Sequence, residues 1–150
     1  MVEVLELAQA VKAAYREIDR RANDAYRPLG VTNAQAEAIL IIGAREPLAL
    51  RELGALIIAE SGHPSRLVDR LVAAGHVDRR TPADRRRVEL SLTASGRKLV
   101  PEILAAQREL LEWGAERLAG HDVPAAVATL HAVFADGPLA DVLACRATSS

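Results

Sequence analysis

The chain has 150 residues, of which 50% are hydrophobic, 3% aromatic and 26% charged, and its net charge at pH 7 is −1. This length fits one domain or one compact subunit, and an apolar content rich in alanine and leucine favours helices. No apolar run approaches the ~18 uncharged residues that a membrane helix needs. The single cysteine, Cys145, excludes an intramolecular disulfide and fits a reducing cytoplasm. Membrane proteins, disulfide-rich scaffolds and disordered tails are therefore excluded.

Two helices are predicted in the first third of the chain. Between residues 4 and 25, apolar side chains recur at steps of three and four, as in an amphipathic helix with one buried stripe. Pro28 and Gly30 end this helix. Thr32 lies three residues before Gln35, which is the spacing of a capping box, so a second helix is expected to begin there.

The next segment has the pattern of a helix-turn-helix. Residues 51–58 predict a short helix, and residues 61–64 open another, because proline is tolerated in a first helical turn. Gly75 is expected to stop this helix in a left-handed conformation. Two helices with a tight connection, the second beginning with small polar residues, are typical of a helix-turn-helix.

A short β-hairpin is predicted after these helices. Residues 76–80 and 87–92 alternate apolar with polar side chains, as half-buried strands do, and a polar, basic loop joins them. Such a hairpin would form a wing beside the two helices.

The last third of the chain is predicted to be helical again. Thr93 caps a long fifth helix, Asp122 caps a sixth helix over residues 123–135, and a last turn runs to Cys145. The apolar stripes on the first, fifth and sixth helices cannot be buried by isolated helices. They either fold back on the winged unit or pair with another chain, and we expect a homodimer.

The charge of the chain is unevenly distributed. Residues 61–98 contain nine basic and four acidic side chains and so carry +5, whereas residues 1–60 carry −2 and residues 99–150 carry −4. A basic middle between acidic ends indicates a local anion-binding face. A solvated arginine-rich surface is the alternative.

Four motifs in this basic region occur in the order and spacing of a known family. They are Leu67-Val68-Asp69-Arg70-Leu71, the glycine Gly75 before the first wing strand, Asp84-Arg85-Arg86 at the wing tip, and Leu92-Thr93-x-x-Gly96. The chain resembles the MarR family of winged helix-turn-helix transcriptional regulators over nearly its whole length. It departs from the family at Gly54, where alanine is usual, and at Pro64, where a branched apolar residue is usual.

The resemblance implies a mainly α-helical fold with a small β-hairpin wing and dimerisation helices at both ends. It divides the chain into a dimerisation helix at 1–30, a winged helix-turn-helix DNA-binding domain at 31–98, and dimerisation helices at 99–150. It implies a cytoplasmic, homodimeric repressor without a cofactor, which binds a pseudo-palindromic operator in double-stranded DNA. Two recognition helices would enter successive major grooves, and the wings would reach the flanking minor grooves.

The recognition helix supplies the first group of candidate DNA-binding residues. A recognition helix presents its N-terminal residues to base edges, and here these are Ser61, His63, Ser65 and Arg66, with Arg70 one turn further on. Arg66 suits a bidentate contact with guanine. Ser61 could equally be a plain helix cap, and a phosphate contact suits Arg70 better than base reading.

The wing tip supplies the second group. Narrow minor grooves attract inserted arginine side chains, and the resemblance implies that Arg86 enters the groove beside Arg85. Asp84 would orient an arginine through a charge-assisted hydrogen bond. The alternative is a solvated turn, although consecutive arginines there would repel one another.

Many relatives release DNA when a small aromatic or phenolic molecule binds between the dimerisation helices and the winged unit. The resemblance makes Tyr15, Tyr26 and Trp113 candidate pocket residues for such an effector, although each could equally belong to the core.

Other functions have little support in the sequence. The four histidines lack the spacing of a metal site, and no phosphate-binding loop, nucleophile elbow or paired carboxylates suggest an enzyme. A winged-helix module that binds protein and no DNA is the alternative function. It would have no use for the basic residues Arg85, Arg86 and Arg87.

Overall fold

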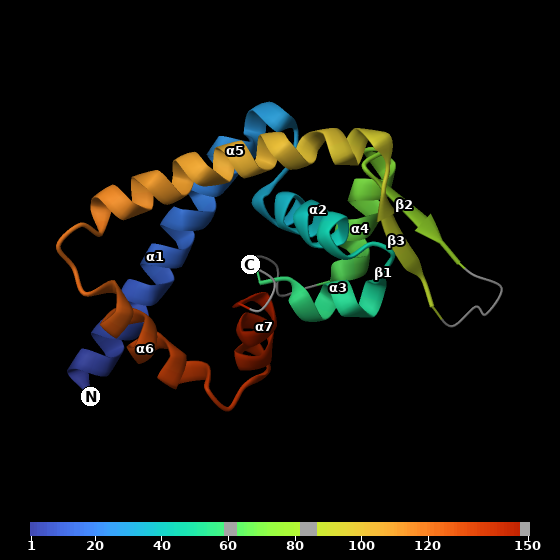
Figure 1. The fold of residues 1–150 in the computed structure, drawn as a ribbon. Coiled ribbons are helices and arrows are strands. Elements are labelled where there is room, and N and C mark those ends of the chain that lie inside the picture. Colours follow the sequence, from blue (N-terminus) through green and yellow to red (C-terminus); the bar gives the residue numbers. More distant parts are fainter. Residues whose placement is uncertain (59–62, 82–86, 148–150) are drawn as a thin grey trace. The chain divides into compact units, whose positions relative to one another are not determined.

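A computed structural model describes residues 1–58, 63–81 and 87–147, and their contacts form two compact units, Met1–Leu110 and Leu111–Ser150 (Figure 1). The structure confirms the predicted fold class, helices with a small antiparallel sheet. The elements in chain order are α1 (Val2–Tyr26), the 3-10 turn η1 (Arg27–Leu29), α2 (Asn33–Arg45), β1 (Leu48–Ala49), α3 (Leu50–Leu56), α4 (Pro64–Ala73), β2 (Val77–Arg80), β3 (Glu89–Leu92), α5 (Ala94–Arg117), α6 (Val123–Phe134) and α7 (Pro138–Ala147).

The start of α2 is fixed by polar side chains. The predicted capping box is present: Thr32 N–H donates to Gln35 Oε1 at 2.8 Å, and Gln35 N–H donates to Thr32 Oγ1 at 3.2 Å. From α1, Asn23 Oδ1 accepts the Asn33 N–H at 2.9 Å, while Asp19 Oδ1 accepts the Asn33 side-chain amide at 2.9 Å. These bonds satisfy backbone donors that a helix start leaves open, and they hold α2 against α1.

The sheet has one strand more than the predicted hairpin. Strands β2 and β3 pair antiparallel with Val77 opposite Leu92, and β1 pairs with the other edge of β3 with Leu48 opposite Leu90. The sequence pattern of the hairpin does not predict β1. Pairing occurs because the free edge of β3 offers backbone groups that need partners.

The core of the first unit lies between its helices and the sheet. The second helix is central, because Ile39 and Ile42 of α2 are fully buried. Other large side chains with almost no exposed surface come from α3, α4, β3 and α5: Leu53, Leu67, Val68, Leu71, Leu90 and Ile103. Each such side chain stabilises the fold by roughly 1.5–3 kcal/mol through burial.

The end of α4 and the starts of β2 and α5 are joined by hydrogen bonds of Thr93. Gly75 ends the recognition helix with φ +76, as predicted, and the Thr93 hydroxyl donates to its carbonyl at 2.6 Å. The His76 carbonyl accepts the Thr93 N–H at 3.1 Å, and Thr93 Oγ1 caps α5 by accepting the Gly96 N–H at 3.0 Å. A Cβ on Gly96 would lie 2.1 Å from the His76 carbonyl oxygen. The Leu-Thr-x-x-Gly motif is therefore a packing requirement.

The described part of the second unit consists of helices joined by short turns. Asp122 caps α6 by accepting the Ala125 N–H at 3.0 Å, as predicted. The predicted last turn is a longer helix, α7. The apolar side chains Val127 and Val133 of α6 are exposed, and so are those of the α1 stripe from Val4 to Ile18. Within the single chain, this stripe is buried only near the end of α1, at Ala22, so of the two predicted alternatives the fold-back is not seen for its larger part.

No helix of the described ranges is both long enough and apolar enough to cross a membrane.

Replacing Gly96 with alanine should destabilise the protein by about 1–3 kcal/mol, because the added methyl group meets a fixed backbone carbonyl. Urea unfolding followed by circular dichroism measures the effect. Gly114→Ala in the same helix is the matched control, since no described residue lies within 4 Å of a Cβ there. The control should gain up to ~1 kcal/mol from helix propensity. Equal stability changes in the two variants would contradict this role of Gly96.

Candidate nucleic-acid interface

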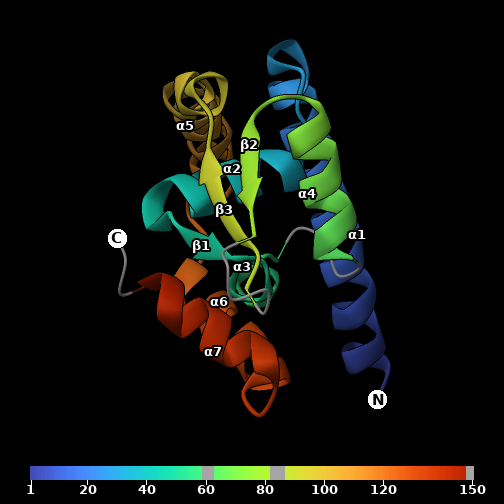
Figure 2. The ribbon, with the colours of Figure 1, turned by 90° about the vertical axis from the view of Figure 1, so that its right-hand side faces the viewer.

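The two faces of α4 have opposite character. Leu67, Val68 and Leu71 are buried, and the helix lies beside β2 (Figure 2). The side chains of Ser65, Arg66 and Arg70 are exposed on the other side. A helix anchored in this way can present its polar face to a groove of DNA without moving relative to the core.

The recognition helix begins later than the sequence suggested. His63 occupies the N-cap position, its carbonyl accepts the N–H groups of Arg66 and Leu67 at 2.9 and 3.3 Å, and Pro64 is the first helical residue. The interpretation of Ser61 as the helix cap is therefore wrong. Ser61 itself lies outside the described residues.

The helix start brings three of the predicted base-reading residues together. His63, Ser65 and Arg66 are exposed within one turn, and Arg70 is exposed one turn later on the side of Arg66. The wing-tip residues Asp84, Arg85 and Arg86 lie outside the described residues, so their roles remain predictions.

An ion pair joins the wing to the recognition helix. Arg79 of β2 donates to Asp69 Oδ1 at 2.8 Å, between exposed parts of both elements. A single exposed pair contributes ~0–1 kcal/mol, so its effect is to orient the strand rather than to hold the fold. Sequence reasoning missed this pair, although an acidic residue among the exposed bases of α4 was a signal for it.

A second residue that sequence reasoning missed lies at the base of the wing. Glu46 follows α2 and accepts the Leu92 N–H at 2.7 Å and an Arg97 N–H at 2.9 Å. Arg97 also donates to the Leu92 carbonyl at 2.9 Å. This cluster fixes the end of β3 against α2 and the start of α5.

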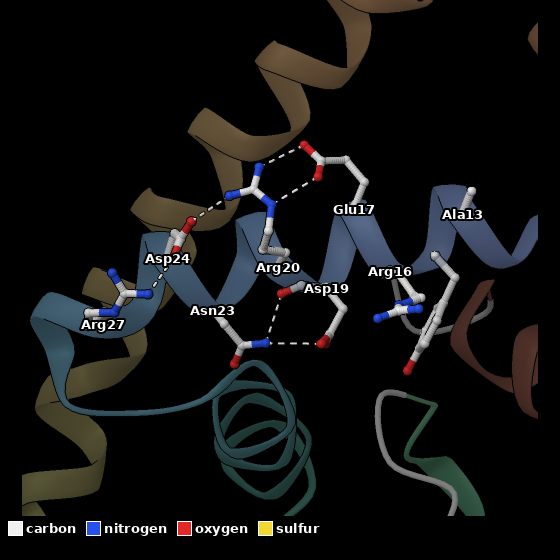
Figure 3. Close-up of a pocket in the computed structure, with 9 residues that line it drawn as sticks. Ala13, Arg16, Glu17, Asp19, Arg20, Asn23, Asp24 and Arg27 are labelled. Carbon is white, nitrogen blue, oxygen red and sulfur yellow. Dashed lines mark hydrogen bonds and ion pairs between the residues drawn. The ribbon is translucent and has the colours of Figure 1, made fainter.

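A shallow hollow on α1 contains one of the candidate effector residues. Its lining includes Tyr15, Arg16 and Arg20 (Figure 3). Tyr26 is buried in the core, where burial and, secondarily, the charge of Glu37 raise the pKa of its phenol.

Trp113, the third candidate effector residue, belongs to the second unit. The structure thus gives the three candidates different surroundings, and the effector pocket remains a prediction.

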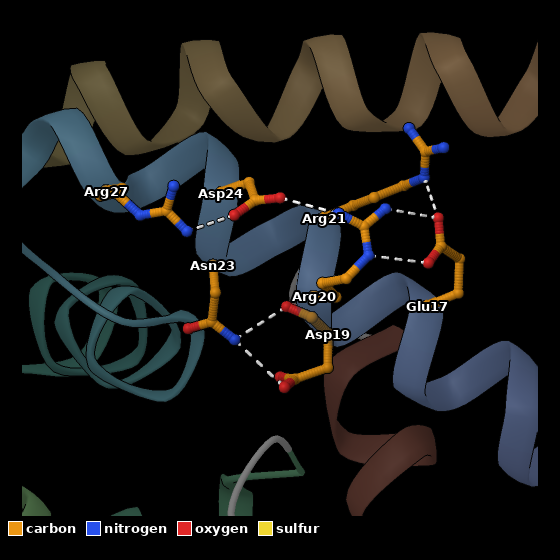
Figure 4. A network of polar contacts seen from close by, with 7 residues as sticks. All are labelled: Glu17, Asp19, Arg20, Arg21, Asn23, Asp24 and Arg27. Atoms are coloured by element: carbon orange, nitrogen blue, oxygen red, sulfur yellow. Dashed lines mark hydrogen bonds and ion pairs between the residues drawn. The ribbon is translucent and has the colours of Figure 1, made fainter.

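A network of charges covers the same face of α1 (Figure 4). Arg20 donates to both oxygens of Glu17 at 2.8 and 2.9 Å, and Arg21 donates to Glu17 Oε1 at 2.6 Å. Asp24 accepts from Arg20 at 2.9 Å and from Arg27. The hydrogen bonds from Arg20, then those from Arg21, lower the pKa of Glu17 to about 2.

Within the described residues, no group of three histidine, cysteine or acidic side chains is placed to hold a metal ion.

The fold and the polar helix define a winged helix-turn-helix protein. A family model described as the winged helix DNA-binding domain matches residues 31–96. The chain is 30% identical over 95 residues to the multiple antibiotic resistance protein MarR of Escherichia coli K12, covering 63% of this chain and 66% of that protein. It is 36% identical over 99 residues to the HTH-type transcriptional regulator TtmR of Methylorubrum extorquens PA1, covering 63% of this chain and 49% of that protein. These alignments thus span about half to two thirds of the curated relatives.

Solved structures extend the similarity. A mutant E. coli MarR complexed with operator DNA superimposes with a TM-score of 0.76 at 26% identity, covering 87% of this chain and 95% of that chain. Apo wild-type MarR gives 0.66 at 26% identity, covering 85% and 96%. The chain belongs to the MarR family of winged-helix regulators.

Lowering the pH should remove the contribution of Glu17 to folding. The pKa of Glu17 is depressed from 4.5 to about 2, so its stabilising effect is complete above 4.5 and is lost as the pH falls through about 2. Carboxyl NMR titration measures this pKa directly. Arg20→Gln should raise it towards 4.5, because Arg20 is its largest cause. Arg16→Gln on the same helix is the control and should leave it near 2. A low pKa that survives Arg20→Gln would contradict the assignment.

Proposed function

We propose that the chain is a sequence-specific DNA-binding transcriptional regulator, which binds a pseudo-palindromic operator as a homodimer. The observation that carries the proposal is the anchored recognition helix, whose exposed start presents His63, Ser65 and Arg66 together. A MarR of the same fold was solved in complex with operator DNA, which supports the same partner here.

Each candidate residue has a distinct role in the proposal. Arg66 contacts a guanine edge in the major groove, with His63 and Ser65 beside it. Arg70 neutralises a phosphate and Ser61 donates to one, whereas Arg66 reads the sequence. At the wing tip, Arg86 enters the minor groove beside Arg85, and Asp84 orients them.

We further propose a cytoplasmic repressor with no enzymatic activity. A small aromatic or phenolic effector would release DNA, with Tyr15, Tyr26 and Trp113 as its candidate contacts. The proposed division is a dimerisation helix at 1–30, the DNA-binding domain at 31–98 and dimerisation helices at 99–150.

Exposed apolar side chains at both ends of the chain support the proposed dimer. On α1 they include Val4, Leu5 and Ile18, with exposed fractions of 66%, 60% and 50%. A contiguous apolar stripe on a helix is normally covered by a partner.

Sedimentation velocity at tens of micromolar protein should give a dimer. Val11→Glu should weaken it by placing a charge on the apolar stripe of α1, because an unpaired charge is costly to bury. Gln9→Glu is the matched control, since residue 9 points to the opposite side of the helix at 100° per residue. A wild-type monomer, or equal behaviour of the two variants, would overturn the proposed dimer surface.

A mobility shift with DNA that flanks the coding region of this protein tests the proposed function, because such regulators often control their neighbours. The logarithm of affinity should fall linearly with the logarithm of salt concentration, by roughly 0.9 per neutralised phosphate. A response that is flat in salt would argue against DNA as the partner and would favour the protein-interaction module.

The same experiment separates base reading from general charge. Arg66→Ala should cost about 1–3 kcal/mol on the best site and relax the preference at one symmetric base pair. Arg108→Ala removes the same charge from the exposed surface of α5 and is the matched control. If Arg66→Ala leaves the preferred motif unchanged, the placement of the recognition helix on DNA is wrong.

A further inference from the structure

The two residues that depart from the usual family pattern, Gly54 and Pro64, lie against each other. Gly54 is the fifth residue of α3, and Pro64 is the first residue of α4. A Cβ built on Gly54 would lie 3.0 Å from Pro64 Cγ and 3.5 Å from Pro64 Cβ. Among the residues that the structure describes, no other heavy atom that such a methyl group would meet lies within 4 Å. The pyrrolidine ring thus occupies the space that the missing side chain leaves.

The presence of glycine at position 54 is explained by its contact with Pro64 and not by its backbone conformation. Of the glycines in the described ranges, those with positive φ are Gly30, Gly75 and Gly120, so Gly54 has a conformation that alanine adopts equally well. Glycine inside a helix is otherwise unfavourable, because it loses more conformational freedom on folding than alanine does. At position 54 this conformational cost is offset, because glycine leaves room for the ring of Pro64.

Pro64 has little freedom to move away from a larger neighbour. Its ring is closed onto the backbone and fixes φ, so Cγ can shift on its own only by ring pucker, and any larger displacement moves the start of α4. Further along α4, Leu67, Val68 and Leu71 are held in the core. A methyl group on Gly54 therefore presses on the first turn of α4, the turn that carries His63, Ser65 and Arg66.

We propose that Gly54 and Pro64 form one positioning pair, which sets the place of the first turn of α4 and thereby the sequence preference of DNA binding. This inference rests on the proposed function. Neither residue needs to touch DNA. The pair acts through the base-reading side chains, whose contacts with base edges depend on geometry.

A double-mutant cycle tests the contact without DNA. Gly54→Ala should lower the midpoint of thermal unfolding in the wild-type background, because the methyl group meets Pro64 Cγ. In the Pro64→Ala background the Cγ atom is gone and the remaining 3.5 Å contact is ordinary. The same Gly54→Ala change should then raise the midpoint, because alanine favours the helix. The reversal of sign is the expected result, and equal shifts in the two backgrounds would overturn the pair.

The readout for positioning is the ratio of affinities for two DNA duplexes. One is the sequence that wild-type protein selects from random DNA, and the other is a scrambled duplex of the same composition. Gly54→Ala should lower the ratio at least about threefold, within the range for residues in contact. Adding Pro64→Ala should restore the ratio to that of Pro64→Ala alone. A purely structural role would weaken both duplexes equally and leave the ratio unchanged.

The outcomes separate this inference from the proposed function. If the wild-type protein has no sequence preference, both are overturned. If it has one and the variants keep the wild-type ratio, only the positioning pair is overturned. If Gly54→Ala does not fold, the affinity ratio of Pro64→Ala is compared with that of the wild type. Losing the ring should lower the ratio, and an unchanged ratio would contradict the proposal.

Discussion

Leu67, Val68 and Leu71 pack one face of α4 into the core, and the whole interface depends on this packing. Three buried aliphatic side chains in ten residues hold the helix along its length. The polar residues between them must then face outward, because a helix turns 100° per residue. Exposure of Ser65, Arg66 and Arg70 is thus a consequence of burying their neighbours. The same burial lets the sheet and α5 act as a rigid support.

Contacts at the two ends of α4 add to this support. At the C-terminal end, Gly75 turns the chain and Thr93 binds both the carbonyl of Gly75 and that of His76. At the N-terminal end, the ring of Pro64 lies against Gly54 of α3. The contact at the C-terminal end consists of hydrogen bonds, and the contact at the N-terminal end consists of van der Waals packing. Both restrict the position of the recognition helix, and neither requires charge.

Charge is used differently in the different parts of the chain. On α1, Arg20 and Arg21 are paired with acidic side chains of the same helix, in the network around Glu17 and Asp24. At the start of α4, by contrast, Arg66 and its neighbours are exposed in a segment with a net charge of +5. This contrast favours an anionic partner at α4, where basic side chains outnumber acidic ones.

The sequence by itself determined the elements and most of their ends. Periodicity predicted the helices and the wing strands, and short motifs fixed the capping box at Thr32, the turn at Gly75 and the cap at Thr93. These features are local, because helix caps and turns depend on residues within a few positions of one another. The exposed basic face of α4 was predictable for the same reason.

Only the tertiary structure decided which distant residues meet. The pairs Asp69–Arg79, Glu46–Arg97, Asn23–Asn33 and Gly54–Pro64 join residues on separate elements. No periodicity encodes such pairs, because they depend on how the elements pack. The third strand of the sheet has the same origin, because β1 pairs with a strand from a distant part of the chain. In each case a partner elsewhere in the chain completes what the local pattern leaves open.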